Sequence, residues 1–206
     1  MIYELAVVTT PELNDDAVTA LKEMVNSVVT EYKGEVAVSD DWGTLRFAQP
    51  TNKGLDRGHF VYFIYKTDAQ TNQELERRLR IHENVVKFIF VRKGDDSRLE
   101  SVVKTYKSPY SKKYRGSQTD DLEDNTDMAK ARRKFARRKS CWYTAKKIDA
   151  DWKDPATFAW LINEFGKIVP ARVSGVSTKH QRFVTTAIKR ARQMGIASYL
   201  TNHVAE

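Results

Sequence analysis

Clustered cations, followed directly by aromatic residues, are the residues of this chain best suited to bind another molecule. The stretch 132–139 reads Arg-Arg-Lys-Phe-Ala-Arg-Arg-Lys, and Trp142 and Tyr143 follow it. Cationic side chains neutralise phosphates, and aromatic rings stack on bases. The pattern predicts a nucleic-acid-binding arm, although a solvated or targeting charge run has the same composition. The predicted RNA-binding residues of this arm are Arg132, Arg133, Lys134, Arg137, Arg138 and Lys139, with Trp142 and Tyr143 as stacking groups.

A second set of cations is spaced for one face of a helix that Ser177 can cap. That face and its flanks comprise Lys179, Arg182, Thr186, Lys189, Arg190, Arg192 and Gln193. The apolar stripe that we expect to pack comprises Phe183, Val184, Ala187, Ile188, Ala191 and Met194. One face therefore packs and the other meets phosphate, and Arg172, just before this helix, is predicted to add a further contact.

Catalytic and metal chemistry have little support in the sequence. The four histidines, His59, His82, His180 and His203, lie far apart without ligand spacing, and the lone Cys141 excludes an intrachain disulfide and a multi-cysteine zinc cluster. The segment 175–179 lacks the full phosphate-loop pattern. We predict a protein that is not an enzyme, with no cofactor and no metal.

The charge divides the chain into unlike halves. Residues 128–206 carry 17 Lys and Arg against 5 Asp and Glu, a net charge of +12, whereas residues 1–127 carry 18 against 22, a net charge of −4. We expect a domain at 1–94, a tail and flexible linker at 95–127, and a basic helical domain at 128–206. Without a secretory signal or a membrane-length apolar run, the chain is expected to be soluble and intracellular.

The N-terminal half predicts an α+β fold. Apolar runs at 3–9, 36–48, 59–66 and 85–91 predict strands, with a bulge or turn at 39–41. Helical spacing predicts one helix from Asn14 to Gly34, and Thr71 with Glu74 has capping-box spacing for another. This order predicts a ferredoxin-like four-stranded antiparallel sheet with two helices on one face. Aromatic residues fill both faces of 59–65, so the second face is expected to be covered or to bind a partner.

In the basic half, Asp154-Pro155 predicts the start of a helix that Gly166 ends, with Phe158, Leu161, Ile162 and Phe165 as its apolar face. The C-terminal domain is therefore expected to be small and mainly α-helical.

Three motifs in this half resemble bacterial small-subunit ribosomal protein eighteen. They are Gly-Lys-Ile-Val-Pro-Ala-Arg-Val-Ser-Gly at 166–175, Ser-Thr-Lys-His-Gln-Arg at 177–182 and Ala-Ile-Lys-Arg-Ala-Arg-Gln-Met at 187–194. The resemblance spans roughly 132–200. It departs at 195–199, where family members commonly have paired leucines and proline.

The N-terminal half is similar to bacterial small-subunit ribosomal protein six over about residues 1–94, especially in Arg-Leu-Arg-Ile-His-Glu-Asn-Val-Val-Lys at 78–87. This resemblance implies the ferredoxin-like topology. It also implies pairing with protein eighteen on the small-subunit platform, and hence small-subunit ribosomal RNA and neighbouring small-subunit proteins as partners. The cytoplasmic ribosome is the expected location, with an organellar ribosome as the alternative.

We therefore predict a fusion that acts as a structural, RNA-binding component of the small ribosomal subunit and is equivalent to a covalently joined heterodimer. A flexible linker of about 35 residues has a reach of about 30 Å, which raises the effective concentration of one half near the other to about the millimolar range. The alternative is a sequence-nonspecific nucleic-acid-binding protein with an RNA-recognition-like domain, because that motif shares this element order and Arg-Gly-His-Phe-Val-Tyr-Phe at 57–63 approaches its aromatic signature.

Overall fold

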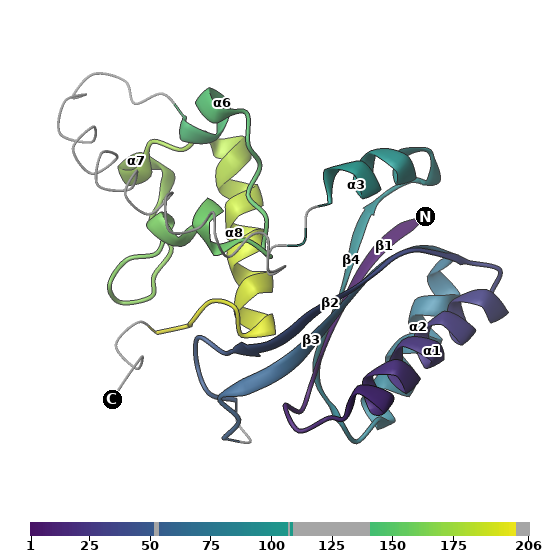
Figure 1. Ribbon diagram of the computed structural model, residues 1–206. Helices are drawn as coiled ribbons and strands as arrows, with labels where there is room; N and C mark the ends of the chain where they lie inside the picture. The colour runs from purple at the N-terminus through teal and green to yellow at the C-terminus, as the bar shows by residue number, and fades with distance from the viewer. Residues whose placement is uncertain (52–53, 107, 109–140, 201–206) are drawn as a thin grey trace. The chain divides into compact units, whose positions relative to one another are not determined.

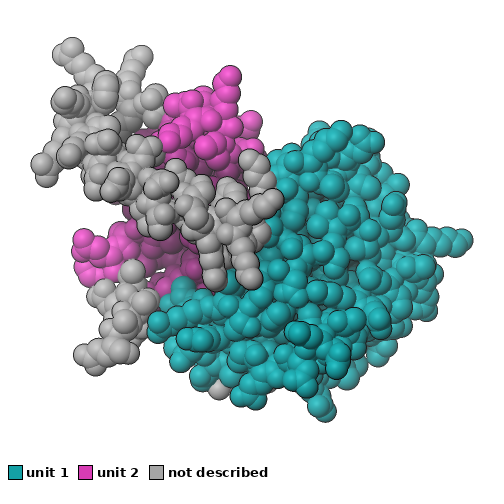
Figure 2. Space-filling view, viewed as in Figure 1, with its two compact units in different colours: residues 1–108 teal, residues 109–206 magenta. Residues whose placement is uncertain are grey.

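The computed structural model describes residues 1–51, 54–106, 108 and 141–200, and the chain divides into two units, Met1–Ser108 and Pro109–Glu206 (Figures 1 and 2). The N-terminal unit contains a sheet with helices, whereas the described part of the C-terminal unit is helical. Among the described residues, no helix is both long enough and apolar enough to span a bilayer.

A four-stranded antiparallel sheet forms the centre of the N-terminal unit, in the order β2-β3-β1-β4. Leu5 of the inner strand β1 lies opposite Phe63 on one side and Phe90 on the other, so apolar residues line up across three strands. The prediction of a four-stranded antiparallel sheet is confirmed. The strands are β1 (Ile2–Thr9), β2 (Glu35–Arg46), β3 (Arg57–Lys66) and β4 (Val85–Gly94).

Two helices, α1 (Asp15–Glu31) and α2 (Ala69–Ile81), cover one face of this sheet, as predicted (Figure 1). Successive strand residues point to opposite faces, so every second residue of β1 and β3 points towards the helices. Burial of these side chains and of the apolar stripes of the helices removes hydrocarbon from water and stabilises the layered arrangement. The buried residues of this core are Tyr3, Leu5, Val7, Val18, Leu21, Val25, Val28, Val29, Val61, Phe63, Tyr65, Leu75 and Leu79.

The other face of the sheet carries an aromatic cluster formed by Trp42, Phe47, Phe60, Tyr62 and Tyr106. The rings of Tyr62 and Tyr106 stack with centroids 4.9 Å apart, and those of Trp42 and Tyr62 stack at 5.1 Å. The Trp42 indole donates to the Tyr106 hydroxyl at 3.0 Å, which orients the two rings. Aromatic side chains of the N-terminal unit itself therefore cover part of the second face.

Tyr106 reaches this cluster because the segment after β4 is folded. A 3-10 turn η1 (Asp96–Arg98) leads into α3 (Leu99–Thr105), and the Tyr106 hydroxyl donates to Asp40 Oδ2 at 2.6 Å. The prediction of a tail and flexible linker from residue 95 is thus wrong as far as Tyr106. A seven-residue helix is too short to show a clear apolar period, and its position depends on the tertiary contact of Tyr106.

Two local predictions also need correction. Helix α2 begins at Ala69 with Asp68 as its N-cap, three residues earlier than the capping-box spacing of Thr71 and Glu74 implied. Thr71 instead lies buried, with its hydroxyl 2.5 Å from that of Thr67. Glu74 pairs instead with Arg78, four residues on, at 2.6 Å. In β2 the strand continues through 39–41, and its register shifts lie on either side, at 36–38 and 41–43.

The C-terminal unit is built around one long helix, α8 (Thr178–Met194). Its core combines residues of α8 with aromatic and apolar residues from the preceding segment. The shorter elements are α6 (Trp142–Lys146), η2 (Pro155–Thr157), η3 (Ala159–Leu161) and α7 (Ala171–Ser174). The most buried core residues are Tyr143, Trp152, Phe158, Leu161, Val184, Ile188, Ala191 and Met194.

The segment after Asp154 forms two 3-10 turns rather than the predicted helix. Asp154 does cap the first turn, and its side chain accepts from the Ala156 amide at 3.0 Å. Phe158 and Leu161 are buried as predicted, but Phe165 is 65% exposed. The helical apolar period fails because the chain turns at Phe158, whose φ of −139° lies outside the helical range.

Candidate nucleic-acid interface

Local sequence signals fix both ends of α8. The Ser177 side chain accepts from the His180 amide at 3.5 Å, which confirms the predicted N-cap. Gly195 follows the last turn with a φ of +78°, a left-handed conformation that ends helices and that glycine adopts without strain. These two caps define which 17 residues form α8, and therefore which side chains lie on each face of the helix.

The solvent face of α8 is cationic and free of carboxylates. The helix contains five Lys and Arg and no Asp or Glu, and Lys179, Arg182 and Lys189 are exposed, as the sequence predicted for this face. Within the described ranges, no carboxylate forms an ion pair with any of these three. Their charges are therefore available to an external anion such as a phosphate group.

Of the other cations predicted to bind RNA, Arg172 is exposed on α7 and Arg190 is partly exposed on α8. Arg192 is engaged within the domain. Its guanidinium donates to the carbonyl oxygens of Ser198 and Gly166 and lies over the ring of Tyr199, with its central carbon 5.5 Å from the centroid. Arg192 thus holds the segment after α8 against the loop at Gly166, and its side chain is less available to a ligand than that of Lys189.

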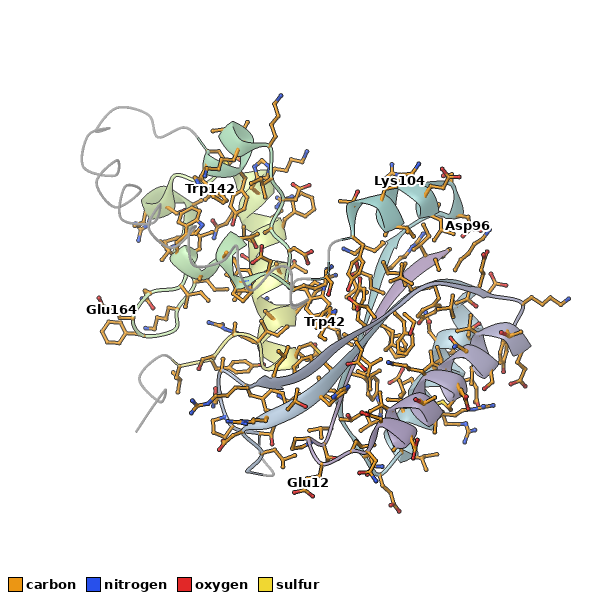
Figure 3. All side chains as sticks on the ribbon, in the orientation of Figure 1. Glu12, Trp42, Asp96, Lys104, Trp142 and Glu164 are labelled. Atoms are coloured by element: carbon orange, nitrogen blue, oxygen red, sulfur yellow. The ribbon has the colours of Figure 1, made fainter. Side chains whose placement is uncertain are left out.

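The two aromatic residues after the basic arm occupy different environments. Trp142 is partly exposed at the start of α6, where Lys146 Nζ lies 5.6 Å from its ring centroid (Figure 3). Tyr143 is 1% exposed, and its hydroxyl donates to the Thr157 carbonyl at 2.5 Å. Burial raises the pKa of Tyr143, with a smaller contribution from Cys141. Trp142 is therefore partly accessible, whereas Tyr143 lies in the core and is not available for stacking.

The basic arm predicted to bind RNA, which comprises Arg132, Arg133, Lys134, Arg137, Arg138 and Lys139, lies outside the described residues. The first described residue after it is Cys141, whose sulfur lies 3.3 Å from His180 Nδ1. Burial opposes ionisation of this thiol, but hydrogen bonds from the backbone and side chains of Ser177 and Thr144 outweigh it and lower the pKa of Cys141 to about 6. In the described part of the chain, no three His, Cys, Asp or Glu side chains are placed to hold a metal ion.

Several exposed cations of the N-terminal unit, by contrast, are already paired with acids. Hydrogen bonds from Arg77 and then Arg78 lower the pKa of Glu74 to about 2. Most of the positive charge on α2 and α3 is therefore neutralised by neighbouring carboxylates. The pairs are Arg77 and Arg78 with Glu74, Arg80 with Glu76, and Lys104 with Glu100, at 2.5 to 3.5 Å.

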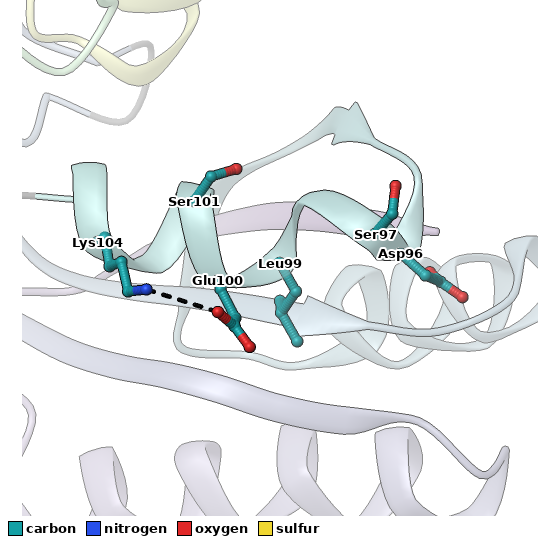
Figure 4. Close-up of a pocket in the computed structure, with 6 residues that line it drawn as sticks. All are labelled: Asp96, Ser97, Leu99, Glu100, Ser101 and Lys104. Carbon is teal, nitrogen blue, oxygen red and sulfur yellow. Dashed lines mark hydrogen bonds and ion pairs between the residues drawn. The ribbon is translucent and has the colours of Figure 1, made fainter.

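An open hollow of about 620 Å³ runs along η1 and α3 (Figure 4). All of its lining residues lie between Asp96 and Lys104. Asp96 is engaged by the N-terminal ammonium at 2.6 Å, and Lys104 is paired with Glu100 at 3.5 Å. A hollow formed by one short segment, with its charges paired, lacks the convergent polar groups of a ligand site.

Comparison with known proteins matches each half of the chain to a different family. Residues 2–92 match the family described as Ribosomal protein S6, and residues 146–197 match the family described as Ribosomal protein S18. The second match contains α7 and α8, which carry Arg172 and the exposed cations of α8.

Individual relatives agree with this division. A small ribosomal subunit protein bS18 of Geotalea daltonii is 46% identical over 76 residues, which are 36% of this chain and 84% of the relative. A small ribosomal subunit protein bS6 of Pelobacter propionicus is 37% identical over 86 residues, 42% of this chain and 66% of the relative. The crystal structure of 30S ribosomal protein S6 from Thermotoga maritima, 24% identical, covers 50% of this chain and 96% of its own, with a TM-score of 0.44.

Proposed function

The chain belongs to the small ribosomal subunit protein bS18 family through its C-terminal half and carries an S6-type N-terminal half, and on this premise we propose that it binds small-subunit ribosomal RNA through α8. Membership of these families supports a role as a structural protein of the small ribosomal subunit. The RNA contact and its position in the platform are the proposal.

The observation that carries the proposal is the acid-free cationic face of α8. Lys179, Arg182 and Lys189 project from one rigid element, and no described carboxylate neutralises them. On binding to RNA, such side chains displace counterions from the phosphates, so that affinity falls as salt rises. Contacts to phosphate set affinity and orientation, and the folded shape of the RNA sets specificity.

The N-terminal half is proposed to support this binding as a covalently joined partner. Aromatic residues on the second face of its sheet stack on one another, and Tyr106 covers Tyr62. This arrangement differs from the open aromatic sheet surface with which an RNA-recognition motif stacks bases. We therefore assign RNA contact to the C-terminal half, and the benefit of the fusion is that the two halves meet at high effective concentration.

The test is competition binding of the full chain to a fragment of small-subunit ribosomal RNA from the platform, at fixed salt. The competitors are random duplex RNA and a fragment from another part of the subunit. A preference for the platform fragment over random duplex of about 100-fold or more would support the proposal. Specific nucleic-acid-binding proteins usually bind their own site about 1,000-fold or more tightly than other sequences, so this threshold is a lenient one. Equal competition by random duplex would instead support a sequence-nonspecific nucleic-acid-binding protein.

The contribution of the fusion is tested by producing the two halves as separate chains. At nanomolar protein, the joined chain is expected to bind small subunits lacking both proteins more completely than the equimolar separate halves. Equal binding at that concentration would remove the proposed role of covalent joining, while the RNA-binding proposal would stand.

A further inference from the structure

An exposed aromatic ring interrupts the cationic face of α8. The sequence pattern placed Phe183 in the packing stripe, but its side chain is 52% exposed, whereas its neighbour Val184 is fully buried. This prediction is wrong because Phe183 lies at the edge of the apolar stripe. The remaining stripe residues, Val184, Ala187, Ile188, Ala191 and Met194, already fill the contact of α8 with the domain.

Helix geometry places Phe183 directly among cations. Lys179 is four residues before it, Thr186 three after and Arg190 seven after, and these intervals put all four on one line along the helix. At a rise of about 1.5 Å per residue, Lys179 lies about 6 Å along the axis from Phe183, and Arg190 lies about 10 Å away on the other side. The ring is therefore flanked by positive charge at both ends.

This setting favours an RNA base over an apolar protein surface as the occupant. The cores of protein interfaces are depleted of lysine, so a ring one helical turn from Lys179 is a poor centre for one. Single-stranded nucleic acid, in contrast, is bound by cations that follow its backbone and by rings on which its bases stack. The line of Lys179, Phe183 and Arg190 has both components.

We propose that Phe183 stacks on an unpaired base of the bound RNA while Lys179 and Arg190 contact the phosphates on either side. The inference rests on the proposed function, since it names how α8 contacts the RNA. Phe183 has no polar group and no charge, so it adds affinity without adding to counterion release. Its effect is therefore separable from that of the cations by salt dependence.

The test compares variants of the full chain in binding to the platform fragment of small-subunit ribosomal RNA over a salt series. Phe183→Ala is expected to weaken binding by about 5- to 150-fold, the range found when a stacking aromatic is replaced by alanine, with an unchanged slope of log affinity against log salt. Phe183→Trp should retain most of the affinity and Phe183→Leu should lose it, because leucine is apolar but has no ring to stack.

Phe165→Ala is the matched control. Phe165 is also an exposed phenylalanine of the same unit, but it lies in the loop before Gly166 and not on α8, so its replacement should leave affinity unchanged. Circular dichroism checks that each variant is folded, and alanine at a half-exposed helical position favours helix.

Wild-type affinity in Phe183→Ala would overturn the stacking role, and equal affinity of the leucine and tryptophan variants would point to an apolar contact instead. Either result leaves the proposed function intact if replacement of α8 cations still lowers the salt slope. If the wild-type chain does not prefer the platform fragment to random duplex, the proposed function and this inference fail together.

Discussion

Removal of the three exposed cations of α8, as Lys179→Ala, Arg182→Ala and Lys189→Ala in one chain, is expected to weaken RNA binding and to flatten its salt dependence. The three side chains are exposed and have no ion-pair partner among the described residues, so the substitution leaves no carboxylate uncompensated there. Alanine is also the best helix former, so α8 should remain folded. Any change in binding then reports on the interaction of these side chains with the RNA.

The magnitude follows from the number of phosphates that the three side chains neutralise. Each phosphate contact contributes about 0.7 to 0.9 to the slope of log affinity against log salt, so removal of three should reduce the slope by about 2 to 3. Between about 50 and 200 mM salt, the wild-type chain should therefore lose about 20- to 40-fold more affinity than the triple variant. Filter binding or fluorescence anisotropy with the platform fragment, over a series of salt concentrations, measures both slopes.

The matched control removes the same net charge from the N-terminal unit. Arg77→Ala, Arg80→Ala and Lys104→Ala replace three cations that already pair with neighbouring acids. This variant should keep the wild-type slope, because contact with phosphate and not total charge determines counterion release. Equal flattening in both triple variants, or an unchanged slope in the α8 variant, would refute the reasoning.

Three further results are expected. Tyr106→Phe removes two hydrogen bonds, the one donated to Asp40 at 2.6 Å and the one accepted from the Trp42 indole at 3.0 Å. It should lower the free energy of unfolding by about 2 to 3 kcal/mol, and a urea titration with no shift in midpoint would contradict this. Gly58→Ala should lower the free energy of unfolding by about 1 to 3 kcal/mol in the same assay, because the added Cβ would lie 2.6 Å from Val8 Cγ1. An unchanged midpoint would contradict this by showing that β1 and β3 accommodate the methyl group without strain. The alkylation rate of Cys141 by iodoacetamide should rise with pH around a midpoint of about 6, and a midpoint near the ordinary value of 9.0 would contradict the proposed hydrogen bonding of the thiolate. Since the folded pKa of Cys141 lies below the unfolded value, its ionisation stabilises the fold fully above pH 9 and this contribution is lost as pH falls through about 6.

The sheet and its two helices were predictable because their signals are local and periodic. The apolar runs at 3–9 and 59–66 match β1 and β3, and the helical spacing from Val18 to Val29 matches α1. Ser177 and Gly195 likewise define the ends of α8 through side-chain capping and a left-handed turn. The same helical period predicted that Lys179, Arg182 and Lys189 lie on the exposed face of α8.

The remaining differences arise from tertiary contacts. Tyr106 holds α3 against the sheet, but in the sequence it is one tyrosine in a polar segment. Arg192 resembles its cationic neighbours until Gly166 and Tyr199 are seen around its guanidinium. Phe183 is apolar and in phase with the buried stripe, and only the packing of the domain shows that its ring stays exposed.

The most direct measurement of the central claim is photocrosslinking from position 186, which lies on the solvent-facing side of α8 between Phe183 and Lys189. A chain with a photoreactive residue in place of Thr186 is assembled into small subunits lacking both proteins and irradiated, and the crosslinked products are sequenced. A chain substituted at Glu23, an exposed residue of α1, is the control. Crosslinks from position 186 to small-subunit ribosomal RNA of the platform, with none from position 23, are predicted. Crosslinks from position 186 to protein alone, or equally to RNA from both positions, would contradict the assignment of RNA binding to α8.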